Sequence, residues 1–576
     1  MSKAEFGMIG LGTMGRNFLL NVAENGFSCV GFDIDPAKRK LLISEASELQ
    51  KSARVSSPSS VSSPHLSKGS ASSAQSRNES TLVYPADDLA SFAAALDTPR
   101  RIMLLVPAGP IVDSVINDLL PHLEKGDIVI DGGNSHFLDT ERREVILNEK
   151  GIEFLGVGVS GGEEGARHGA SIMIGGKPEV YQRVRAIFEA ASAKVNGEPC
   201  AAHVGIGSAG HFVKMVHNGI EYGLMQILAE TYDFMLRVLR MDCRQMSETF
   251  AKWNDSRLNS FLVEITADIL RKTDAETGKP LVEMVLDKAA QKGTGKWTSQ
   301  AAMDLGVPIP TIDSAVSMRQ ISAQKETRLV IAEKYGMPIV PGDLPADGET
   351  VTSERQHDMK ARHARKDVKT TVSEQQVGTE SGSDRGVIVR NPANDAADRP
   401  RNDREVAAEF KSHFSESLRQ LEDTLSASFI VTYAQGLSLL HTASVERKYG
   451  VNISEVAKIW RGGCIIRSAL LEDIRRAFSE NPDLRNLILD DQFVKILSNN
   501  RDEWHAIVGE FSESRIPSAC LSSALAYFDA FLSPRLPANL IQAQRDYFGA
   551  HTYQRTDKEG IFHTPDWKTN AEAGTK

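Results

Sequence analysis

The sequence predicts a doubly wound α/β amino-terminal domain, followed by a large all-α domain and a carboxy-terminal tail. Short apolar runs at 6–9, 28–32, 102–106, 128–131 and 154–159 alternate with helix-length amphipathic segments, a pattern typical of a parallel sheet. From residue 208 onward the apolar spacing is that of long helices. A chain of 576 residues is also too long for one hydrophobic core.

These patterns divide the chain into residues 1–207, an all-helical domain at 208–533 and a tail at 534–576. Two segments interrupt them: the serine-dominated residues 50–80 and the charged, Gly- and Pro-rich residues 341–405. Both have too few large apolar groups for a core, so we expect disordered insertions. Inert surface loops are favoured over a regulatory role.

Composition narrows the class of protein. The chain has 66 basic and 76 acidic residues, a formal charge of −10, which argues against a nucleic-acid or anionic-membrane partner. No apolar run has the length of a membrane span, and the start of the chain has no signal-peptide pattern. We expect a cytoplasmic protein with reduced thiols, because its five cysteines are scattered and odd in number: Cys29, Cys200, Cys243, Cys464 and Cys520.

The first strand of the chain leads into a glycine-rich turn and then a helical pattern from Asn17. Strand, turn and helix in this order are the context of a Rossmann-like dinucleotide site, whose glycines allow a tight turn and close approach of the pyrophosphate. Asp33 ends the second strand, where an acidic group binds a ribose hydroxyl. A P-loop is excluded because Arg16 follows the last glycine. The predicted nucleotide-binding turn comprises Gly10, Leu11, Gly12, Thr13, Met14 and Gly15.

A polar stripe occupies one face of a predicted helix in the middle of the chain. Its spacing of i, i+3, i+4, i+7 and i+8 places five side chains together, and apolar neighbours flank them, so we expect the face to meet a wet, charged cavity. Acid–base chemistry needs a pair of titratable groups held in this way; the alternative is a solvated face with a chance pair. The stripe consists of Lys214, His217, Asn218, Glu221 and Tyr222.

Seven sequence motifs extend along most of the chain. They are GLGTMGRNFLLN near the start, DIVIDGGNS at 127–135, GVSGGEEGARHG at 158–169, VKMVHNGIEYG at 213–223, QKGTGKWT at 291–298, IWRGGCIIR at 459–467 and NLIQAQRDYFGAHTYQRTD at 539–557. In this order they resemble the decarboxylating 6-phosphogluconate dehydrogenases. The broader β-hydroxyacid dehydrogenases share the first few motifs, whereas the last resembles the phosphogluconate branch alone.

The resemblance implies a reaction of the oxidative pentose phosphate pathway. The 3-hydroxyl of 6-phosphogluconate is oxidised by hydride transfer to a nicotinamide, the β-keto acid loses CO2, and the enediol is reprotonated to ribulose 5-phosphate. Lys214 matches the family's general base, which then acts as an acid, and Glu221 matches its general acid. No metal is implied, and the sequence has no ligand cluster such as HExxH.

Further site residues follow from the resemblance. Val106, Ala108 and Asn134 match cofactor contacts. Substrate contacts are implied for Asn134, Ser160, Gly161 and Gly162 at the carboxylate end, for His217 and Asn218 at the sugar hydroxyls, and for Tyr222, Lys292, Thr294, Arg319, Arg545 and His551 at the phosphate. Without the family, Ser160 to Gly162 suggest an anion-binding loop, His217 could be a core histidine, and Arg545 a surface arginine. In the family the tail enters the partner subunit, so we expect an obligate homodimer in which Arg545 and His551 complete the neighbouring site.

The sequence departs from the family at the cofactor site. Most members use NADP and hold its 2′-phosphate with an Asn-Arg-Thr triplet, which is here Asp33-Ile34-Asp35; a lysine after the fourth strand is here Pro107. Like-charge repulsion at such a site costs on the order of a few kcal/mol. We therefore expect NAD to be favoured, although Lys38, Arg39 and Arg16 could support NADP.

Two rival interpretations stay open. A related β-hydroxyacid dehydrogenase that acts on a small unphosphorylated acid would need neither Arg319 nor Arg545. A catalytically idle nucleotide-sensing scaffold would be expected to lose the reactive pair, whereas Lys214 and Glu221 are both present.

Overall fold

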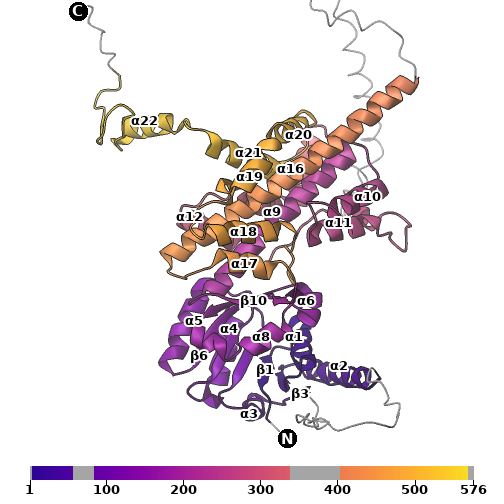
Figure 1. Ribbon diagram of the computed structural model, residues 1–576, viewed down its shortest axis with the longest axis vertical. Helices are drawn as coiled ribbons and strands as arrows, with labels where there is room; N and C mark the ends of the chain where they lie inside the picture. The colour runs from indigo at the N-terminus through magenta and orange to yellow at the C-terminus, as the bar shows by residue number, and fades with distance from the viewer. Residues whose placement is uncertain (1–2, 56–82, 338–402, 569–576) are drawn as a thin grey trace, which may run out of the picture.

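The protein consists of an α/β domain, a helical domain stacked on it and a tail that extends to one side (Figure 1). The computed structural model describes residues 3–55, 83–337 and 403–568. Helix α9, Ala209–Arg237, starts at the sheet and continues into the helical domain beside α16, Asp403–Glu446. A single helix therefore belongs to both domains.

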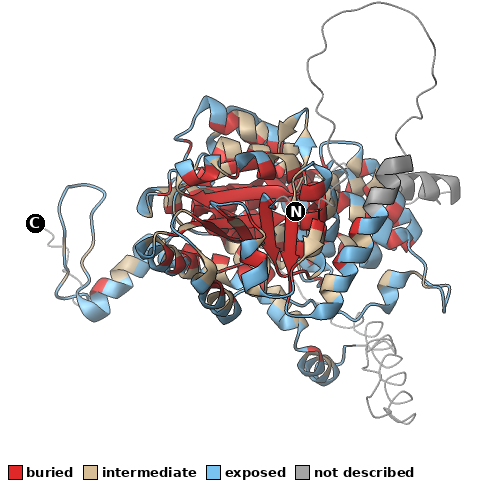
Figure 2. Cartoon of the chain, turned by 90° about the horizontal axis from the view of Figure 1, so that it is seen from below, coloured by how far each residue is buried: buried red, intermediate tan, exposed pale blue. Residues whose placement is uncertain are grey.

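The α/β domain is built on an eight-stranded sheet in the order β10-β7-β6-β5-β4-β1-β2-β3. Strands β1 to β6 run parallel, whereas β7 is antiparallel to β6 and parallel to β10. In the view from below, the sheet forms the buried centre of the domain (Figure 2). The strands are β1 Phe6–Ile9, β2 Cys29–Phe32, β3 Val83–Pro85, β4 Arg101–Leu104, β5 Ile128–Asp131, β6 Glu153–Ser160, β7 Ser171–Gly176 and β10 Ala201–Gly205, with a separate pair β8 Lys194–Val195 and β9 Glu198–Pro199.

Helices flank this sheet and connect its strands. They are α1 Thr13–Glu24, α2 Pro36–Val55, α3 Leu89–Ala94, α4 Pro110–Leu119, η1 Leu120–His122, α5 Phe137–Glu149, α6 Gly162–His168, α7 Pro178–Gln182 and α8 Arg185–Ala191.

The rest of the described chain is helical. Besides α9 and α16 it contains α10 Cys243–Asn254, α11 Phe261–Arg271, η2 Leu281–Met284, α12 Thr294–Asp304, α13 Pro310–Ser322, α14 Lys325–Lys334, α17 Ile453–Trp460, α18 Leu470–Glu480, η5 Leu487–Leu489, α19 Asp491–Asn499, α20 Arg501–Glu513, α21 Ala519–Leu532 and α22 Ala538–Gly549.

Glycines bring α9 directly against the sheet. A Cβ on Gly158 of β6 would overlap the Cβ of Lys214, and one on Gly210 would overlap the backbone of β6 and β7. Farther along α9, the buried carboxylate of Glu230 accepts the backbone N–H groups of Cys520 and Leu521 at 2.9 Å each, at the start of α21. Helix α9 thus links the sheet to the helix that precedes the tail.

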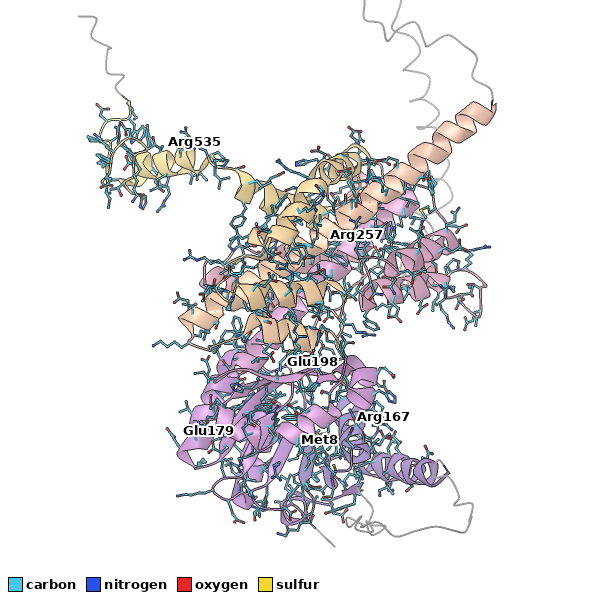
Figure 3. All side chains as sticks on the ribbon, in the orientation of Figure 1. Met8, Arg167, Glu179, Glu198, Arg257 and Arg535 are labelled. Carbon is cyan, nitrogen blue, oxygen red and sulfur yellow. The ribbon has the colours of Figure 1, made fainter. Side chains whose placement is uncertain are left out.

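Ion pairs join the two domains near Glu198, which Figure 3 labels at their junction. Its carboxylate accepts from both Nη atoms of Arg475, at 2.8 and 3.0 Å, and from Arg461. Hydrogen bonds from these two arginines lower the pKa of Glu198 from its usual value to about 2, although burial opposes the shift. The carboxylate is therefore charged at neutral pH and holds the domains together.

The predicted fold class is confirmed, with corrections at its edges. Strands β3, β7 and β10 of the sheet and the separate pair β8–β9 were not among the predicted apolar runs. Helix α2 extends to Val55 and α16 begins at Asp403, so the prediction of disorder is wrong for residues 50–55 and 403–405; good helix formers such as Gln50 and Lys51 continue the helix. The remainder of both predicted insertions lies outside the described residues.

Two further findings concern the class of protein. Within the described ranges, no helix is both long and apolar enough to cross a membrane. All five cysteines are buried and unpaired.

Candidate active site

The glycine-rich turn after β1 has the geometry that a bound pyrophosphate needs. Gly10 has a φ of 97°, and a Cβ on it would overlap the carbonyl oxygen of Leu105. A Cβ on Gly15 would likewise overlap the carbonyl of Gly10, whereas one on Gly12 would meet open space. No side chain caps the start of α1, so its first N–H groups are available to an anion. The turn therefore fits a dinucleotide.

Asp33 directly follows β2, beside this turn, and is almost fully buried. Its carboxylate accepts the backbone N–H of Leu11 at 2.8 Å and that of Asp35 at 2.9 Å. The amine of Lys38 lies 3.4 Å from the same carboxylate, and Arg39 donates to the Asp33 carbonyl at 2.6 Å. A negative charge thus stands where the adenosine ribose of a dinucleotide binds.

One more cation near the turn, Arg16, has partners of its own, and the side chain of Ile34 points outward. Arg16 is paired with Glu45 at 2.8 Å and donates to the carbonyl of Leu11 at 3.3 Å. Ile34, between the two carboxylates, is 87% exposed. The side chain at position 34 therefore points to solvent, next to the place expected for the ribose.

The ends of β4 and β5 supply the next part of the site. Val106 is half-buried and Ala108 is exposed after β4, and Asn134 is exposed after β5. Because β1 lies between β4 and β2 in the sheet and these strands are parallel, these residues and the glycine turn lie at the same edge of the sheet, at the carboxyl ends of the strands. Open α/β sheets bind ligands in a crevice outside that edge.

The polar stripe of α9 is more enclosed than the sequence suggested. Lys214 is 6% exposed, and His217, Asn218 and Tyr222 are also buried, while the Glu221 side chain is 21% exposed. In this single chain the face is therefore largely enclosed, with the Glu221 side chain as its most exposed member; the wet, charged cavity along it stays a prediction. The face packs against the end of β6 and the helical domain, because Gly158 allows close approach.

A chain of polar contacts connects three of these residues with Ser160 at the end of β6. The Nζ of Lys214 donates to Ser160 Oγ at 3.0 Å, and this hydroxyl lies 3.2 Å from Nε2 of His217. Nδ1 of His217 lies 3.2 Å from Asn218 Oδ1. With Nδ1 assigned as the protonated nitrogen, Ser160 donates to Nε2 and His217 donates to Asn218.

The reactive pair meets at the same imidazole. Nδ1 of His217 is 3.5 Å from the amine of Lys214 and 3.8 Å from a carboxylate oxygen of Glu221. The two groups therefore project toward one region, as their spacing on the helix predicts.

Burial dominates the electrostatics of this cluster. Burial lowers the pKa of the Lys214 amine, while the Glu221 carboxylate and the Cys464 thiol raise it. Burial raises the pKa of Glu221, while Lys214 and Arg319 lower it. Burial and the Lys214 charge hold the pKa of His217 well below its ordinary value, although the hydrogen bond that His217 donates to Asn218 acts to raise it. Thus His217 is neutral at neutral pH, and burial shifts the pKa values of Lys214 and Glu221 toward each other.

Cationic and helix-terminal groups gather at the other end of the stripe. The Arg319 guanidinium lies 3.4 Å from the centre of the Tyr222 ring. That ring packs against Gly295 in the first turn of α12, where a Cβ would lie 2.6 Å from it. Thr294 begins α12 and is buried, and Lys292 is exposed just before it. A helix N-terminus beside an arginine favours an anion such as phosphate.

Sequence reasoning assigned no role to the residues that close the site from the helical domain. A Cβ on Gly161 would lie 2.5 Å from the carbonyl of Gly463, and the ring of Trp460 lies edge-on to His217 with 5.5 Å between centroids. The ring of Trp297 in α12 lies edge-on to that of His136, two residues after Asn134, with 5.0 Å between ring centroids. Trp460 and Gly463 belong to the motif IWRGGCIIR, and Trp297 belongs to QKGTGKWT. These two motifs are the sequence features that could have indicated the contacts.

The structure of one chain does not bring Arg545 and His551 to this site. Arg545 donates to Gln542 of its own helix at 3.1 Å, and His551 contacts Phe548, in the tail that extends away from the body in Figure 1. Around them Asp546 accepts hydrogen bonds from the backbone of Thr552 and Thr564, from His563 and from Trp567. Asp546 therefore ties together residues 546–567 of the tail.

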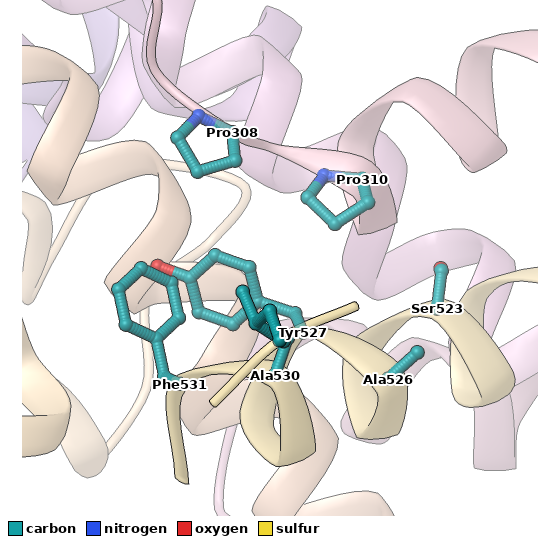
Figure 4. A pocket seen from close by; sticks show the side chains of 8 residues that line it. Pro308, Pro310, Ser523, Ala526, Tyr527, Ala530 and Phe531 are labelled. Carbon is teal, nitrogen blue, oxygen red and sulfur yellow. The ribbon is translucent and has the colours of Figure 1, made fainter. Parts of the chain in front are cut away.

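Two pockets in the described structure lie apart from the site. An apolar groove of about 440 Å³ runs between the start of α13 and α21, lined by residues such as Pro308, Tyr527 and Phe531 (Figure 4). A polar pocket of about 470 Å³ is lined by Glu141 and Arg447 among others. Among the described residues, no three His, Cys, Asp or Glu side chains are grouped so that they could hold a metal ion.

Comparison with known families gives a match over both domains. Residues 5–205 match the family described as the NAD binding domain of 6-phosphogluconate dehydrogenase. Residues 210–373 and 381–567 match the family described as 6-phosphogluconate dehydrogenase, C-terminal domain.

Individual relatives match over their full length. The chain is 42% identical over 567 residues to a Bacillus subtilis protein named 6-phosphogluconate dehydrogenase, NADP(+)-dependent, decarboxylating, covering 98% of this chain and 100% of the relative. It is 40% identical to the Haemophilus influenzae protein named 6-phosphogluconate dehydrogenase, decarboxylating, covering 98% and 96%. The Plasmodium falciparum 6-phosphogluconate dehydrogenase structure, described as apo and in complex with NADP+ and with 6-phosphogluconate, superimposes with a TM-score of 0.77 and 36% identity, covering 97% of this chain and 100% of that one.

Proposed function

The chain belongs to the decarboxylating 6-phosphogluconate dehydrogenases and catalyses the oxidative decarboxylation of 6-phosphogluconate, and from this premise we propose roles for its own residues. The observation that carries the proposal is the convergence of Lys214, Glu221 and Ser160 on His217, next to the crevice at the carboxyl ends of the strands. The amine and the carboxyl are the two groups that the reaction needs.

Lys214 acts as the base in the first step. When bound, the oxidised nicotinamide accepts the hydride from C3 of the substrate. The amine removes the proton of the 3-hydroxyl, which requires it to be neutral. Burial lowers its pKa in that direction, and the hydrogen bond to Ser160 holds its position.

The protonated amine then assists the second step. It donates to the new carbonyl oxygen at C3, which draws electrons as the bond to the carboxylate breaks and CO2 leaves. Glu221 gives its proton to C1 of the enediol and so completes ribulose 5-phosphate. The raised pKa of its carboxyl keeps a larger fraction protonated for this step.

The remaining groups bind and orient the substrate. Ser160, Gly161, Gly162 and Asn134 face the carboxylate end, and His217 with Asn218 binds the sugar hydroxyls. We assign the phosphate to the region that contains Tyr222, Lys292, Thr294 and Arg319, because it combines cations with the amino terminus of α12.

The test is cofactor reduction at 340 nm with 6-phosphogluconate, together with measurement of released CO2. Lys214→Ala is expected to lower kcat by about 10²- to 10⁴-fold, as removal of a general base does. A Lys214→Ala protein that keeps its kcat would refute the assignment of the base. An unchanged absorbance with both cofactors would instead favour an idle nucleotide-binding protein.

We propose that NAD is the preferred cofactor. The buried Asp33 carboxylate is positioned to accept from the 2′-hydroxyl of a ribose, and it would repel a 2′-phosphate. Arg16 is engaged with Glu45, and Arg39 with the Asp33 carbonyl, so neither cation is free for that phosphate. The names of the Bacillus and Plasmodium proteins refer to NADP, so this chain would differ from them.

We also propose a homodimer in which the tail of one subunit completes the site of the other. In a single chain, Arg545 lies on a helix that extends away from the body. Leu540, Ile541 and Phe548 on this helix and at its end are 61%, 60% and 72% exposed, an apolar surface typical of an interface. The apolar groove beside α21 lies near the start of the tail. A cytoplasmic location is consistent with five unpaired cysteines.

A further inference from the structure

Arg143 lies between the two loops that we place around the nicotinamide. It comes from α5, and only 2% of its surface is exposed. Its Nε and Nη2 donate to the two oxygens of Asp113, at 2.8 and 3.1 Å, and Nη2 also donates to the carbonyl of Gly109 at 3.0 Å. Gly109 and Asp113 belong to the segment that follows β4.

The third nitrogen of the Arg143 guanidinium, Nη1, donates to residues at the end of β5 and just after it. Nη1 donates to Asp131 Oδ2 and to Ser135 Oγ, both at 3.1 Å. Asp131 is buried, and its carboxylate also accepts the backbone N–H of Gly133 at 3.1 Å and the hydroxyl of Ser135 at 2.7 Å. Asn134 stands between Gly133 and Ser135, so both of its neighbours are fixed by the carboxylate that Arg143 binds.

The two loops also touch each other. The backbone N–H of Gly132 donates to the carbonyl of Leu104 at 2.9 Å. A Cβ on Gly133 would lie 3.3 Å from the carbonyl oxygen of Val106. A displacement of either loop is therefore transmitted to the other, and with it to Asn134.

We propose that Arg143 is a positioning residue for hydride transfer, which clamps the loop at 106–113 to the loop at 131–135 and thereby sets where the nicotinamide ring lies relative to C3 of the substrate. The inference rests on the proposed placement of the nicotinamide at Val106, Ala108 and Asn134. The planar fork of an arginine makes five hydrogen bonds here. A lysine keeps the charge but has no such fork and bridges fewer partners.

Arg100 provides a matched control, because its partner Asp127 lies at the opposite end of β5 from Asp131. Arg100 is also buried, and it donates to Asp127 at 2.7 Å and to the carbonyl of Ala93 at 2.9 Å. Asp127 directly precedes β5, whereas Asp131 ends it. Arg100→Lys therefore disturbs a comparable buried ion pair that lies far from the cofactor loops.

The experiment compares full-length Arg143→Lys and Arg100→Lys with the unchanged enzyme, using 6-phosphogluconate with hydrogen or deuterium at C3. For Arg143→Lys we expect kcat to fall on the order of 10²-fold, the effect of a displacement of about 1 Å in the reacting groups. The deuterium isotope effect on kcat should rise because hydride transfer becomes the slow step. The KM for 6-phosphogluconate should change little. Arg100→Lys should lose thermal stability but keep both kcat and the isotope effect.

The clamp is refuted if Arg143→Lys retains the kcat and isotope effect of the unchanged enzyme, or if Arg100→Lys changes them equally. If Arg143→Lys does not fold, Asp113→Asn loosens only the β4 side and is measured in its place with the same expectations. The variant Asn134→Ala distinguishes the proposed placement of the nicotinamide from the proposed clamp by Arg143. An unaffected Asn134→Ala would overturn the nicotinamide placement together with the clamp, whereas an impaired Asn134→Ala beside an unaffected Arg143→Lys would overturn the clamp alone.

Discussion

The amine of Lys214 lies 3.0 Å from the hydroxyl of Ser160, which joins the helix that carries the proposed base to the strand end that faces the cofactor crevice. Both side chains are buried. The position of the amine is therefore set by the α/β domain, while its pKa depends first on burial, which lowers it, and then on Glu221 and Cys464, which raise it.

Glu221→Gln should alter the pH dependence as well as the rate. The Glu221 carboxylate raises the pKa of Lys214, so its removal lowers that pKa and leaves the amine neutral at lower pH. We expect kcat to fall by about 10²- to 10⁴-fold through loss of the acid, and the acidic limb of the residual kcat/KM profile to move to lower pH. The substrate phosphate titrates equally in both proteins, so the difference isolates the enzyme group.

The control for this experiment is Asp233→Asn, on the same helix but paired with Arg237 at 3.2 Å. It should leave the acidic limb in place. A limb that stays or moves to higher pH in Glu221→Gln would show that this carboxylate does not act on the base.

Arg319→Met should weaken the enzyme selectively for the phosphorylated substrate. Loss of one hydrogen bond to a charged group costs about 1.5–3 kcal/mol, so we expect KM for 6-phosphogluconate to rise about 10- to 100-fold. The kcat/KM for gluconate, which lacks the phosphate, should change little. Arg328→Met, which breaks a pair with Asp287 at 2.9 Å, is the matched control. Equal use of gluconate and 6-phosphogluconate by the unchanged enzyme would favour the small-acid dehydrogenase.

Asp33→Asn combined with Ile34→Arg should move cofactor preference from NAD toward NADP. Asparagine retains an oxygen for the N–H of Leu11, and an arginine at the exposed position 34 supplies a cation to a 2′-phosphate. We expect the kcat/KM ratio to shift by about 10- to 100-fold. The control variant, Asp33→Asn with Ile34→Gln, places a long polar side chain without a positive charge at position 34. A clear NADP preference of the unchanged enzyme would end the proposal.

Mixing two inactive variants tests whether the tail acts on the neighbouring subunit. Lys214→Ala and Arg545→Met should each be nearly inactive as homodimers. After dissociation and random reassociation, one site of each heterodimer combines an intact Lys214 with an intact Arg545, so about one quarter of full activity should return. Lys214→Ala mixed with Glu221→Gln should recover none, because both residues belong to the same subunit. Absence of recovery in the first mixture would place Arg545 in its own subunit's site.

The parts of the fold that the sequence predicts are those with a strong local signal. Strands β1, β2, β4, β5 and β6 are continuous apolar runs, as expected for strands buried on both faces. Strands β7 and β10 were missed because their sequences, SIMIGG and AAHVG, are short and rich in small residues. Their glycines serve the close approach of α9, a tertiary requirement that no periodicity reveals.

In the site, too, the residues with a local sequence signal could be predicted, and those that depend on tertiary packing could not. The spacing of Lys214, His217 and Glu221 on one helix predicts their meeting, because helical geometry fixes it. The contacts of Trp460 and Gly463 could not be derived, since they depend on how two distant segments pack. The role of the buried Arg143 could not be derived either, because two of its partners, Gly109 and Asp113, lie 34 and 30 residues before it in the sequence.

The continuity of α9 has a consequence for how this sequence can vary in length. Insertion of one residue into an α-helix turns everything beyond it by about 100°. Between Lys214 and Glu221 such a change would rotate the carboxyl away from the amine, and between Glu221 and Glu230 it would detach the anchor of α21. A one-residue insertion within α9 therefore displaces at least one of these contacts, whereas an insertion in a connection between elements leaves the spacing of Lys214, Glu221 and Glu230 along the helix unchanged.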